Sequence, residues 1–357
     1  MHLDVAPSVS AVGRALPKNH LDQEALIAAL RGLWAAKHYN VDRLEDLHRA
    51  VQVSGRYLAL PLEGYVGLDT FARCNDAWID AATGLGEAAL RDALERAGVA
   101  PADVDHLFFV TVTGIATPSV DAKLVNRLGM KATVKRTPIF GLGCVAGAAG
   151  TARAADYLRA FPGEVAVLLS VEVCSLTLQR EDLSVANIVA SGLFGDGAAA
   201  LVLEGGARAR SRGGPRVLAT RSVFYRDTER VMGWDVVESG FKVVLSAKVP
   251  EIVREHVGRD VDAFLGEHGL ARRDVRHWIA HTGGPKVLQA FEGALALPEG
   301  ALARSWRSLR EVGNLSSASV LFVLADLLDA GEARPGDLGV MVAMGPGFCS
   351  EIVLLAW

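Results

Sequence analysis

Apolar residues in this chain follow two patterns, one typical of buried strands and one typical of helices. Near-continuous apolar runs predict strands covered on both faces at 106–112, 165–173 and 275–280. Stretches rich in Ala and Leu at helical spacing predict helices that begin near Asp22 and that cover 43–51 and 76–97. A glycine-rich turn at 192–202 leads into a further strand.

The most distinctive segment, residues 137–161, has the sequence TPIFGLGCVAGAAGTARAADYLRAF. A short β-type run meets Gly141 and Gly143, and a helical pattern of small residues follows, so Cys144 lies at a turn from strand to helix. Glycine permits the positive φ angles and the close backbone approach that such a turn requires. A thiol at a helix N-terminus faces unpaired N–H groups, which favour its thiolate. Cys144 is therefore a candidate nucleophile, although a cysteine is more commonly a small core residue.

The pattern around this turn recurs in the second half of the chain. Residues 98–109, GVAPADVDHLFF, resemble residues 269–280, GLARRDVRHWIA, and at nearly the same spacing Cys144 aligns with Asn314. Ordered matches at a near-constant spacing indicate duplication of a βαβ-type half-domain. We therefore expect Cys144 and Asn314 to begin equivalent helices that face each other across a pseudo-two-fold axis. The Gly- and Arg-rich segment 204–215 is the best candidate for the boundary between the halves.

The second half supplies the polar groups that a nucleophilic cysteine needs. His281 follows the predicted strand 275–280 and precedes a Thr-Gly-Gly-Pro turn. Catalytic groups collect at the carboxyl ends of strands in α/β sheets, although a lone histidine is more often structural. Asn314 opens another helix of small residues, where its simplest role is that of an N-cap.

Composition and charge exclude several classes of protein. The 357 residues are 50% hydrophobic and 22% charged with a net charge of -4, as in a globular protein of one large or two ordinary domains. The mild acidity argues against a nucleic-acid partner. The chain has no apolar run of roughly 18 residues and no signal-peptide layout at its start, so we expect a cytoplasmic protein without stable membrane insertion. Four scattered cysteines without a CxxC pair or a His cluster indicate neither a disulfide framework nor a metal site.

Five ordered segments resemble the chalcone and stilbene synthase superfamily, the type III polyketide synthases, and specifically its bacterial branch. They are GLGCVAGAAG, GLFGDGAAALV, HTGGP, GNLSSAS and MGPGFCSEIVLLAW. The match extends from Val12 to Trp357 in family order. It implies a thiolase-like α/β fold, five-layered αβαβα and built from two duplicated halves, that acts as a homodimer. Residues 1–208 would form the half with the nucleophilic Cys, and residues 219–357 the half with His and Asn.

The resemblance also implies a mechanism. Cys144 would take an acyl group from an acyl-CoA, its thiolate stabilised by His281 and the helix N-terminus. Malonyl-CoA would lose CO₂ beside His281 and Asn314, whose N–H groups would hold the enolate oxygen. The enolate would attack the Cys144 thioester in an iterative decarboxylative Claisen condensation, and the product would then cyclise. No metal or redox cofactor is required for this chemistry.

Further site residues are carried over from the same family. Phe194 matches the gatekeeper phenylalanine between the coenzyme A tunnel and the cavity, and Val243 replaces a second gatekeeper of plant members. Trp234 replaces a glycine of the plant enzymes and would block the space for a bulky aromatic starter. The other implied pocket residues are Thr113, Thr177, Ser316, Gly345, Pro346 and Gly347, with Thr117 reaching across the dimer interface. The implied coenzyme A contacts are Arg49, Arg56, Gly283, Gly284 and Lys286, although several basic residues of the family's cluster are missing.

Two alternatives to a polyketide synthase stay open at this point. A β-ketoacyl-acyl-carrier-protein synthase of the initiating type shares the fold and a Cys-His-Asn triad but uses a carrier protein. A catalytically silent acyl-binding protein with the thiolase fold would take up one acyl group without turnover. Among polyketide products, Val243 and the small pocket residues favour an aliphatic acyl-CoA starter and an alkylpyrone or alkylresorcinol.

Overall fold

The computed structural model describes residues 6–35, 40–208 and 214–357, so part of the candidate boundary 204–215 lies outside the described residues. Within these residues, nine strands form one sheet in the order β11-β12-β13-β8-β1-β7-β6-β4-β5. The strands are β1 Ser8–Ala15, β4 His106–Thr111, β5 Lys135–Phe140, β6 Val165–Val173, β7 Asp196–Glu204, β8 Arg216–Phe224, β11 Val275–Ala280, β12 Leu338–Gly345 and β13 Cys349–Ala356. Separate antiparallel pairs join β2 (Asn19–Asp22) to β3 (Gly55–Leu58) and β9 (Met232–Val237) to β10 (Gly240–Leu245).

The pairing of strands repeats between the two ends of the sheet. In the first half β4 is parallel to β6, β6 is antiparallel to β7, and β7 is antiparallel to β1. In the second half β11 is parallel to β12, β12 is antiparallel to β13, and β13 is antiparallel to β8. The two sets meet where β1 pairs with β8. This repetition is the arrangement that the internal sequence match predicts.

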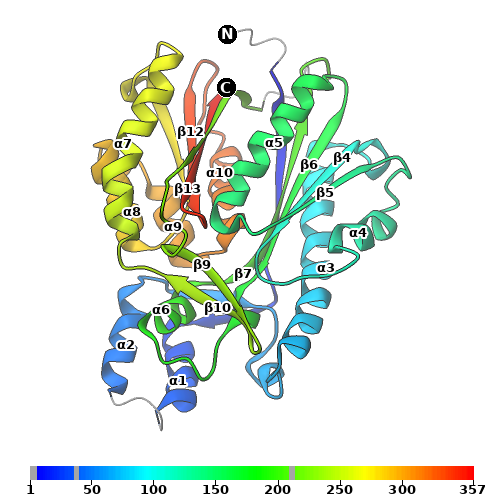
Figure 1. The fold of residues 1–357 in the computed structure, drawn as a ribbon. Helices are drawn as coiled ribbons and strands as arrows, with labels where there is room; N and C mark the ends of the chain where they lie inside the picture. Colours follow the sequence, from blue (N-terminus) through cyan, green and yellow to red (C-terminus); the bar gives the residue numbers. More distant parts are fainter. Residues whose placement is uncertain (1–5, 36–39, 209–213) are drawn as a thin grey trace.

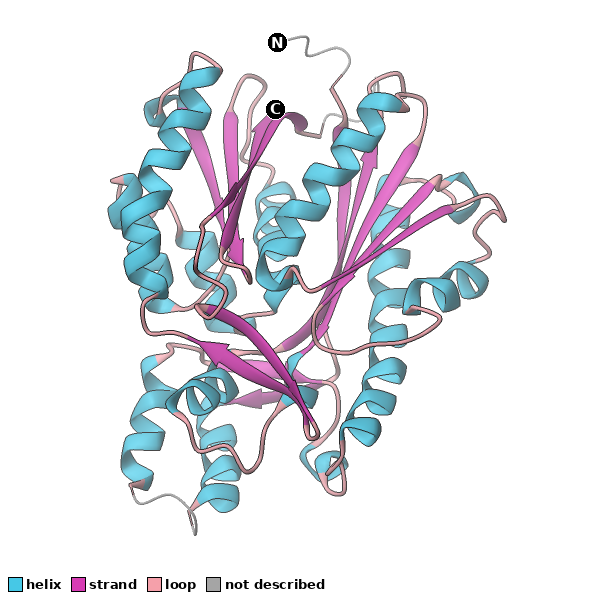
Figure 2. Ribbon diagram, viewed as in Figure 1, coloured by secondary structure: helices cyan, strands magenta, loops and turns pink. Residues whose placement is uncertain are grey.

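Helices cover both outer faces of the sheet and also fill the space between its two halves (Figure 1). The helices are α1 Gln23–Trp34, α2 Val41–Ala50, α3 Phe71–Ala97, α4 Val120–Leu128, α5 Ala146–Ala160, α6 Val185–Leu193, α7 Val249–Glu267, α8 Pro285–Leu295, α9 Ala303–Val312 and α10 Ser319–Ala330. Helix α3 packs on the outer face of the first half, and α7 and α8 pack on that of the second. Helices α5 and α10 lie between the halves, in contact with the inner faces of both (Figure 2). This α, β, α, β, α layering confirms the predicted fold class.

The two central helices approach each other unusually closely. A Cβ atom placed on Gly147 of α5 would lie 2.3 Å from the carbonyl oxygen of Ser317. Atoms at that distance overlap, so only glycine fits here. The small-residue pattern of the 137–161 segment therefore reflects contact between backbones, as the sequence indicated.

Most predicted elements occur near their expected positions. The strand at Val165–Val173 and the helix end at Gly98, which has φ +57°, agree with the apolar pattern. Helix α3 begins earlier than predicted, at Phe71, because the Thr70 side chain caps it by accepting from Arg73 N. Helix α6, Val185–Leu193, was not predicted.

Candidate active site

Cys144 lies in a single turn of 3-10 helix, Gly143–Val145, between β5 and α5. Gly141 and Gly143 have φ angles of +98° and +54°, so both glycines adopt the left-handed conformation that the predicted turn requires. A Cβ atom on Gly143 would lie 2.7 Å from Pro346 Cδ, which places the closing Gly-Pro-Gly turn directly against the nucleophile turn. The thiol is 7% exposed, and Cys144 Sγ lies 3.6 Å from Ser316 Oγ.

His281 follows directly after β11 and is 3% exposed. Its backbone N–H donates to Val342 O at 3.0 Å, which continues the pairing with β12. Nδ1 of the ring is buried without a hydrogen-bond partner in the described residues. Gly284, with φ +123°, then turns the chain into α8.

Asn314 is held by both its backbone and its side chain. Its N–H donates to Leu193 O at 2.9 Å and its carbonyl accepts from Gly195 N at 3.0 Å, so Asn314 pairs with the segment that carries Phe194. The side-chain Oδ1 accepts from Ser316 N at 2.8 Å and from Ser319 Oγ at 3.3 Å. Asn314 therefore closes a turn onto Ser316 through its side-chain oxygen, although Leu315 is the N-cap of the 3-10 turn that follows, and the two bonds to Oδ1 fix the orientation of its amide. No hydrogen bond among the described residues uses Nδ2, which leaves that group able to donate to a ligand.

Cys144, His281 and Asn314 line one small cavity of about 50 Å³. The three residues come from three separate segments, and the cavity unites the first half of the chain with the second. Apolar residues form most of the remaining wall: Val112, Leu193, Val249, Val253, Val287, Phe291 and Met344. The juxtaposition predicted from the internal repeat is therefore present.

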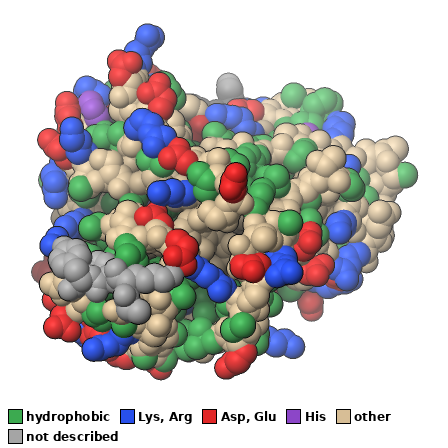
Figure 3. Space-filling view, turned by 60° about the horizontal axis from the view of Figure 1, so that its bottom comes forward, with side chains coloured by type: hydrophobic (Ala, Val, Ile, Leu, Met, Phe, Trp, Pro, Cys, Tyr) green, Lys and Arg blue, Asp and Glu red, His purple; other side chains and the backbone are tan. Residues whose placement is uncertain are grey.

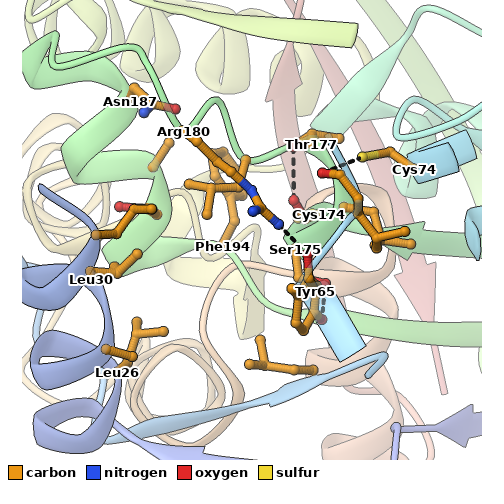
Figure 4. A pocket seen from close by; sticks show the side chains of 18 of the residues that line it. Leu26, Leu30, Tyr65, Cys74, Cys174, Ser175, Thr177, Arg180, Asn187 and Phe194 are labelled. Carbon is orange, nitrogen blue, oxygen red and sulfur yellow. Dashed lines mark hydrogen bonds between the residues drawn. The ribbon is translucent and has the colours of Figure 1, made fainter. Parts of the chain in front are cut away.

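A second, larger cavity of about 370 Å³ adjoins the first. Four residues line both cavities and form the wall between them: Cys174, Phe194, Trp234 and Val243. Figure 4 shows Leu26 and Leu30 of α1 on one side of the larger cavity, with Thr177 and Cys174 on the other. Half of its lining residues are leucine, valine or alanine, which suits an apolar ligand.

Burial keeps both the thiol and the imidazole uncharged. It raises the pKa of Cys144 to about 12, with a smaller contribution from the nearby charge of Glu172, while the contact with Ser316 acts in the opposite direction. It lowers the pKa of His281 to about 4. The helix N-terminus favours a thiolate, but Cys144 is buried, and desolvation favours the neutral thiol. Burial therefore favours a neutral pair and opposes the thiolate that the local sequence suggested.

This neutral pair predicts a steep pH dependence for alkylation of Cys144. Iodoacetamide reacts with the thiolate, so the rate at Cys144 should rise by about tenfold per pH unit through the neutral range. Peptide mapping by mass spectrometry separates Cys144 from Cys74, Cys174 and Cys349. A rate that stays constant between about pH 6 and 8 and falls on His281→Ala substitution would instead indicate a preformed thiolate–imidazolium pair.

Comparison with known proteins assigns the chain to a family. The chain matches the family models of chalcone and stilbene synthases, the N-terminal domain over residues 5–207 and the C-terminal domain over residues 217–356. The chain belongs to the chalcone and stilbene synthase family. This membership favours a polyketide synthase over the carrier-protein-dependent synthase left open by the sequence.

Individual relatives refine the placement within the family. The chain is 52% identical to 1,3,6,8-tetrahydroxynaphthalene synthase of Streptomyces peucetius subsp. caesius, over 99% of this chain and 94% of that protein. It is 38% identical to 3,5-dihydroxyphenylacetyl-CoA synthase of Streptomyces toyocaensis, over 76% of this chain and 71% of that protein. The crystal structure of the tetrahydroxynaphthalene synthase of Streptomyces coelicolor A3(2), a bacterial type III polyketide synthase, matches with a TM-score of 0.92 and 30% identity, covering 98% of this chain and 99% of that one. The predicted class, a bacterial type III polyketide synthase, is confirmed.

The residues predicted for the pocket and for coenzyme A binding lie in different places: in the two cavities, in the closing turn, at the start of α8 and on the surface. Ser316 and Pro346 line the small cavity, as does Gly283, an implied coenzyme A contact, and Thr177 lines the larger one. Gly345 and Gly347 shape the closing turn: a Cβ on Gly345 would lie 2.7 Å from Leu142 O, and Gly347 has φ +72°. Gly284 and Lys286 lie at the start of α8, and Thr117 is exposed on the surface.

Thr113 lies in a buried hydrogen-bond network and does not line either of these cavities. Its hydroxyl donates to Glu172 Oε2 at 2.9 Å and accepts from Trp78 Nε1 at 3.1 Å. Glu172 is fully buried, accepts also from Val112 N at 3.1 Å and from Ser317 Oγ, and burial raises its pKa. Glu172 was not predicted, although it is a lone acidic residue within the apolar run 165–173, which is the signal for such a buried group.

The two arginines implied as coenzyme A contacts are already engaged. Arg56 is 1% exposed, and its Nη atoms donate to Gln23 and to backbone carbonyls of the 191–194 segment. Arg49 is exposed, but it pairs with Glu24 at 2.9 Å and with Glu45 at 3.3 Å. Arg56 is therefore not the solvent-facing entrance residue that the resemblance implied, because it supports the backbone before Phe194.

Neither a membrane helix nor a metal cluster occurs in the part of the chain that the structure describes. No helix there is both long and apolar enough to span a bilayer. The same residues contain no group of three or more His, Cys, Asp or Glu side chains suited to a metal ion.

Proposed function

We propose that this type III polyketide synthase loads its growing chain on Cys144 and extends it with malonyl units decarboxylated beside His281 and Asn314. The observation that carries the proposal is the shared cavity, since three chemically complementary side chains from separate segments line it. Nucleophile, base and amide donor then act on one thioester.

In the loading step, Cys144 Sγ forms a bond to the thioester carbonyl carbon. His281 is neutral at physiological pH because burial lowers its pKa to about 4, so its imidazole can accept the thiol proton as that bond forms. The proton then passes to the departing sulfur, and coenzyme A leaves as its thiol. The N-terminus of α5 stabilises negative charge that develops on Cys144 Sγ.

In the extension step, the bond between the malonyl carboxylate and its α-carbon breaks, CO₂ leaves, and the electron pair forms an enolate. Asn314 Nδ2–H and the His281 N–H donate to the enolate oxygen, and neither is acidic enough to protonate the carbanion. The α-carbon attacks the Cys144 thioester, and Cys144 leaves as a thiolate that regains a proton. The lengthened chain remains on coenzyme A and can reload. These steps balance without a metal or redox cofactor, and we propose none.

We propose malonyl-CoA as both starter and extender, and a polyhydroxylated naphthalene as the product. The 52% identity to a 1,3,6,8-tetrahydroxynaphthalene synthase supports this choice. The carbon skeleton of such a naphthalene can derive entirely from malonyl units. Trp234 and the small catalytic cavity agree with a compact starter, because the indole occupies space that a bulky acyl group would need.

The larger cavity favours a second candidate product. Its apolar lining and volume of about 370 Å³ suit the tail of an aliphatic acyl-CoA starter, which would give the alkylpyrone or alkylresorcinol predicted from the sequence. The two candidates differ in whether the space beyond Phe194 and Trp234 holds a starter tail or a malonyl-derived chain.

Incubation with malonyl-CoA, alone and with a panel of acyl-CoA starters, tests the proposal by mass spectrometry of the products. Efficient turnover of malonyl-CoA alone to a naphthalene supports the first candidate. Products that retain the tail of each starter, with little turnover of malonyl-CoA alone, support the second. Acylation of Cys144 without release of any product would indicate an acyl-binding protein and contradict both.

We also propose that the enzyme is a homodimer that associates through β5. This strand lies at the end of the sheet order, with only β4 beside it in the described residues. Phe140 is 52% exposed and Ile115 is 46% exposed, so apolar side chains accompany an unpaired strand edge. A closed dimer would cover both and bring Thr117 toward its partner. Sedimentation equilibrium should give twice the 37.8 kDa chain mass, and a monomer mass would contradict the dimer.

A further inference from the structure

The segment that carries Phe194, in the wall between the two cavities, is held from two sides. On the side of the catalytic cavity, Asn314 N donates to Leu193 O at 2.9 Å and Gly195 N donates to Asn314 O at 3.0 Å. On the other side lies Arg56 of β3, which lines the larger cavity. A Cβ atom on Gly195 would lie 3.4 Å from Arg56 Cβ, so the arginine packs directly against this segment.

Arg56 supplies hydrogen-bond donors where α6 ends. Phe194 is the C-cap of this helix, and the last carbonyl groups of a helix have no partners within it. Nη1 of Arg56 donates to Ser191 O at 2.9 Å and to Phe194 O at 3.2 Å. Nη2 donates to Gly192 O. One planar guanidinium therefore fixes three carbonyl groups, and its positive charge lies at the negative end of the helix dipole.

The guanidinium is buried, and its charge is compensated inside the protein. Charged side chains are spread over the face of the molecule in Figure 3, where Lys and Arg are interspersed with Asp and Glu. Arg56 and Asp196, by contrast, are 1% and 0% exposed, and the two side chains attract each other electrostatically. Because a buried charge is costly unless it is paired and hydrogen-bonded, these contacts hold the guanidinium in one orientation.

We propose that Arg56 is a positioning residue that fixes Phe194 in the wall and thereby limits which acyl chains reach the larger cavity. Phe194 is joined to the guanidinium through its own carbonyl, so loss of that contact frees the backbone to which the ring is attached. A ring that moves opens a passage from Cys144 into the space of about 370 Å³. This inference rests on the proposed function, because an acyl chain must be loaded on Cys144 before the wall can select it.

The Arg56→Lys variant tests the proposal on the full-length enzyme. Lysine keeps the charge beside Asp196, but its ammonium group cannot donate to three carbonyls from one plane. In a mixture of hexanoyl-CoA and malonyl-CoA, the ratio of hexanoyl-started to malonyl-started products should therefore rise roughly five- to tenfold. Gln23→Leu is a milder second variant, because Gln23 Oε1 accepts from Arg56 Nη2 and helps to orient it. It should shift the ratio in the same direction by about twofold.

A matched control and a double-mutant cycle separate positioning from general destabilisation. His48 is also fully buried, and its Nε2 donates to Ile188 O at 2.9 Å, earlier in α6. His48→Leu should lower the temperature of thermal unfolding and leave the product ratio unchanged. If Arg56 acts through the ring of Phe194, Arg56→Lys should change the ratio by less than about twofold in a Phe194→Ala background.

Fluorine NMR of enzyme labelled with 4-fluorophenylalanine provides a measurement that does not depend on turnover. The signal of Phe194, assigned by its loss in Phe194→Leu, should shift or broaden in Arg56→Lys and stay unchanged in His48→Leu. A signal identical in Arg56→Lys and the wild type overturns the assignment, as does an equal change of the product ratio with and without the Phe194 ring. A wild-type enzyme that forms no product from either starter contradicts the proposed function instead, and the fluorine signal still decides the role of Arg56.

Discussion

The Cys144→Ala variant is expected to lose acyl loading and all product formation, whereas Asn314→Asp is expected to load normally and to lose decarboxylation. Removal of the nucleophile should reduce turnover on the order of 10⁴-fold or more. Asn314→Asp keeps the oxygen that accepts from Ser316 N at 2.8 Å, so this turn is retained, but it removes the Nδ2–H donor of the amide. Loss of one preorganised donor to an enolate should slow CO₂ release by roughly 10²- to 10³-fold.

Two assays separate these outcomes. Intact-protein mass spectrometry after incubation with an acyl-CoA detects the covalent adduct, and release of labelled CO₂ from malonyl-CoA reports decarboxylation. Ser319→Ala serves as the control because it removes a longer contact, 3.3 Å, to the same Asn314 oxygen and leaves the amide donor in place. Condensation by Cys144→Ala, or decarboxylation at the wild-type rate in Asn314→Asp, contradicts the assigned roles.

Trp234→Gly is expected to join the two cavities and to change which starters the enzyme accepts. Trp234 lines both cavities, and its ring centroid lies 6.5 Å from that of Phe194. Removing the indole should connect a space of about 50 Å³ with one of about 370 Å³. The preference for bulky over malonyl starters, measured as a ratio of kcat/KM, should shift by on the order of tenfold or more.

A graded pair of variants isolates the effect of volume. Trp234→Phe keeps an aromatic wall and should retain most of the original preference, while Trp234→Gly should not. Product profiles from competing mixtures of acyl-CoA starters provide the measurement. Equal profiles for Trp234→Gly and the wild type would show that this side chain does not limit the starter. Thermal unfolding of both variants checks that each remains folded.

The apolar pattern predicted the elements whose hydrophobic residues match their burial in the folded protein. The run 165–173 reads as a strand because helices cover both of its faces, and β6 is buried along its whole length. Strand β8, Arg216–Phe224, was not predicted, because most of its residues are only partly buried and they include two arginines, a threonine and a serine. Its place in the sheet depends on pairing with β13, which lies far along the chain.

Site residues were predictable from the sequence where a glycine turn or the internal repeat indicated their position. They were less predictable where residues far along the chain determine their burial and hydrogen bonds. Gly141 and Gly143 predict the turn that carries Cys144, and the internal repeat predicts that Asn314 lies opposite Cys144. Arg56 appeared to be a surface charge because its acceptors, such as Ser191 O at 2.9 Å, lie 135 residues away. The burial of Cys144, which raises the pKa of its thiol, was not predictable either, because residues far along the chain, such as Ser316, contribute to it.

The contact between Gly147 and Ser317 determines both how the two central helices pack and where Cys144 and Asn314 lie. Gly147 is the third residue after Cys144, and Ser317 is the third after Asn314, so the two copies of one ancestral position touch where the halves meet. Any side chain at Gly147 must push the helices apart, and the sulfur and the amide at their ends would move with them. Laboratory evolution of this enzyme therefore cannot change the distance between α5 and α10 without also moving Cys144 and Asn314. Substitutions at Trp234, in the wall between the two cavities, are a better route to new substrate specificity.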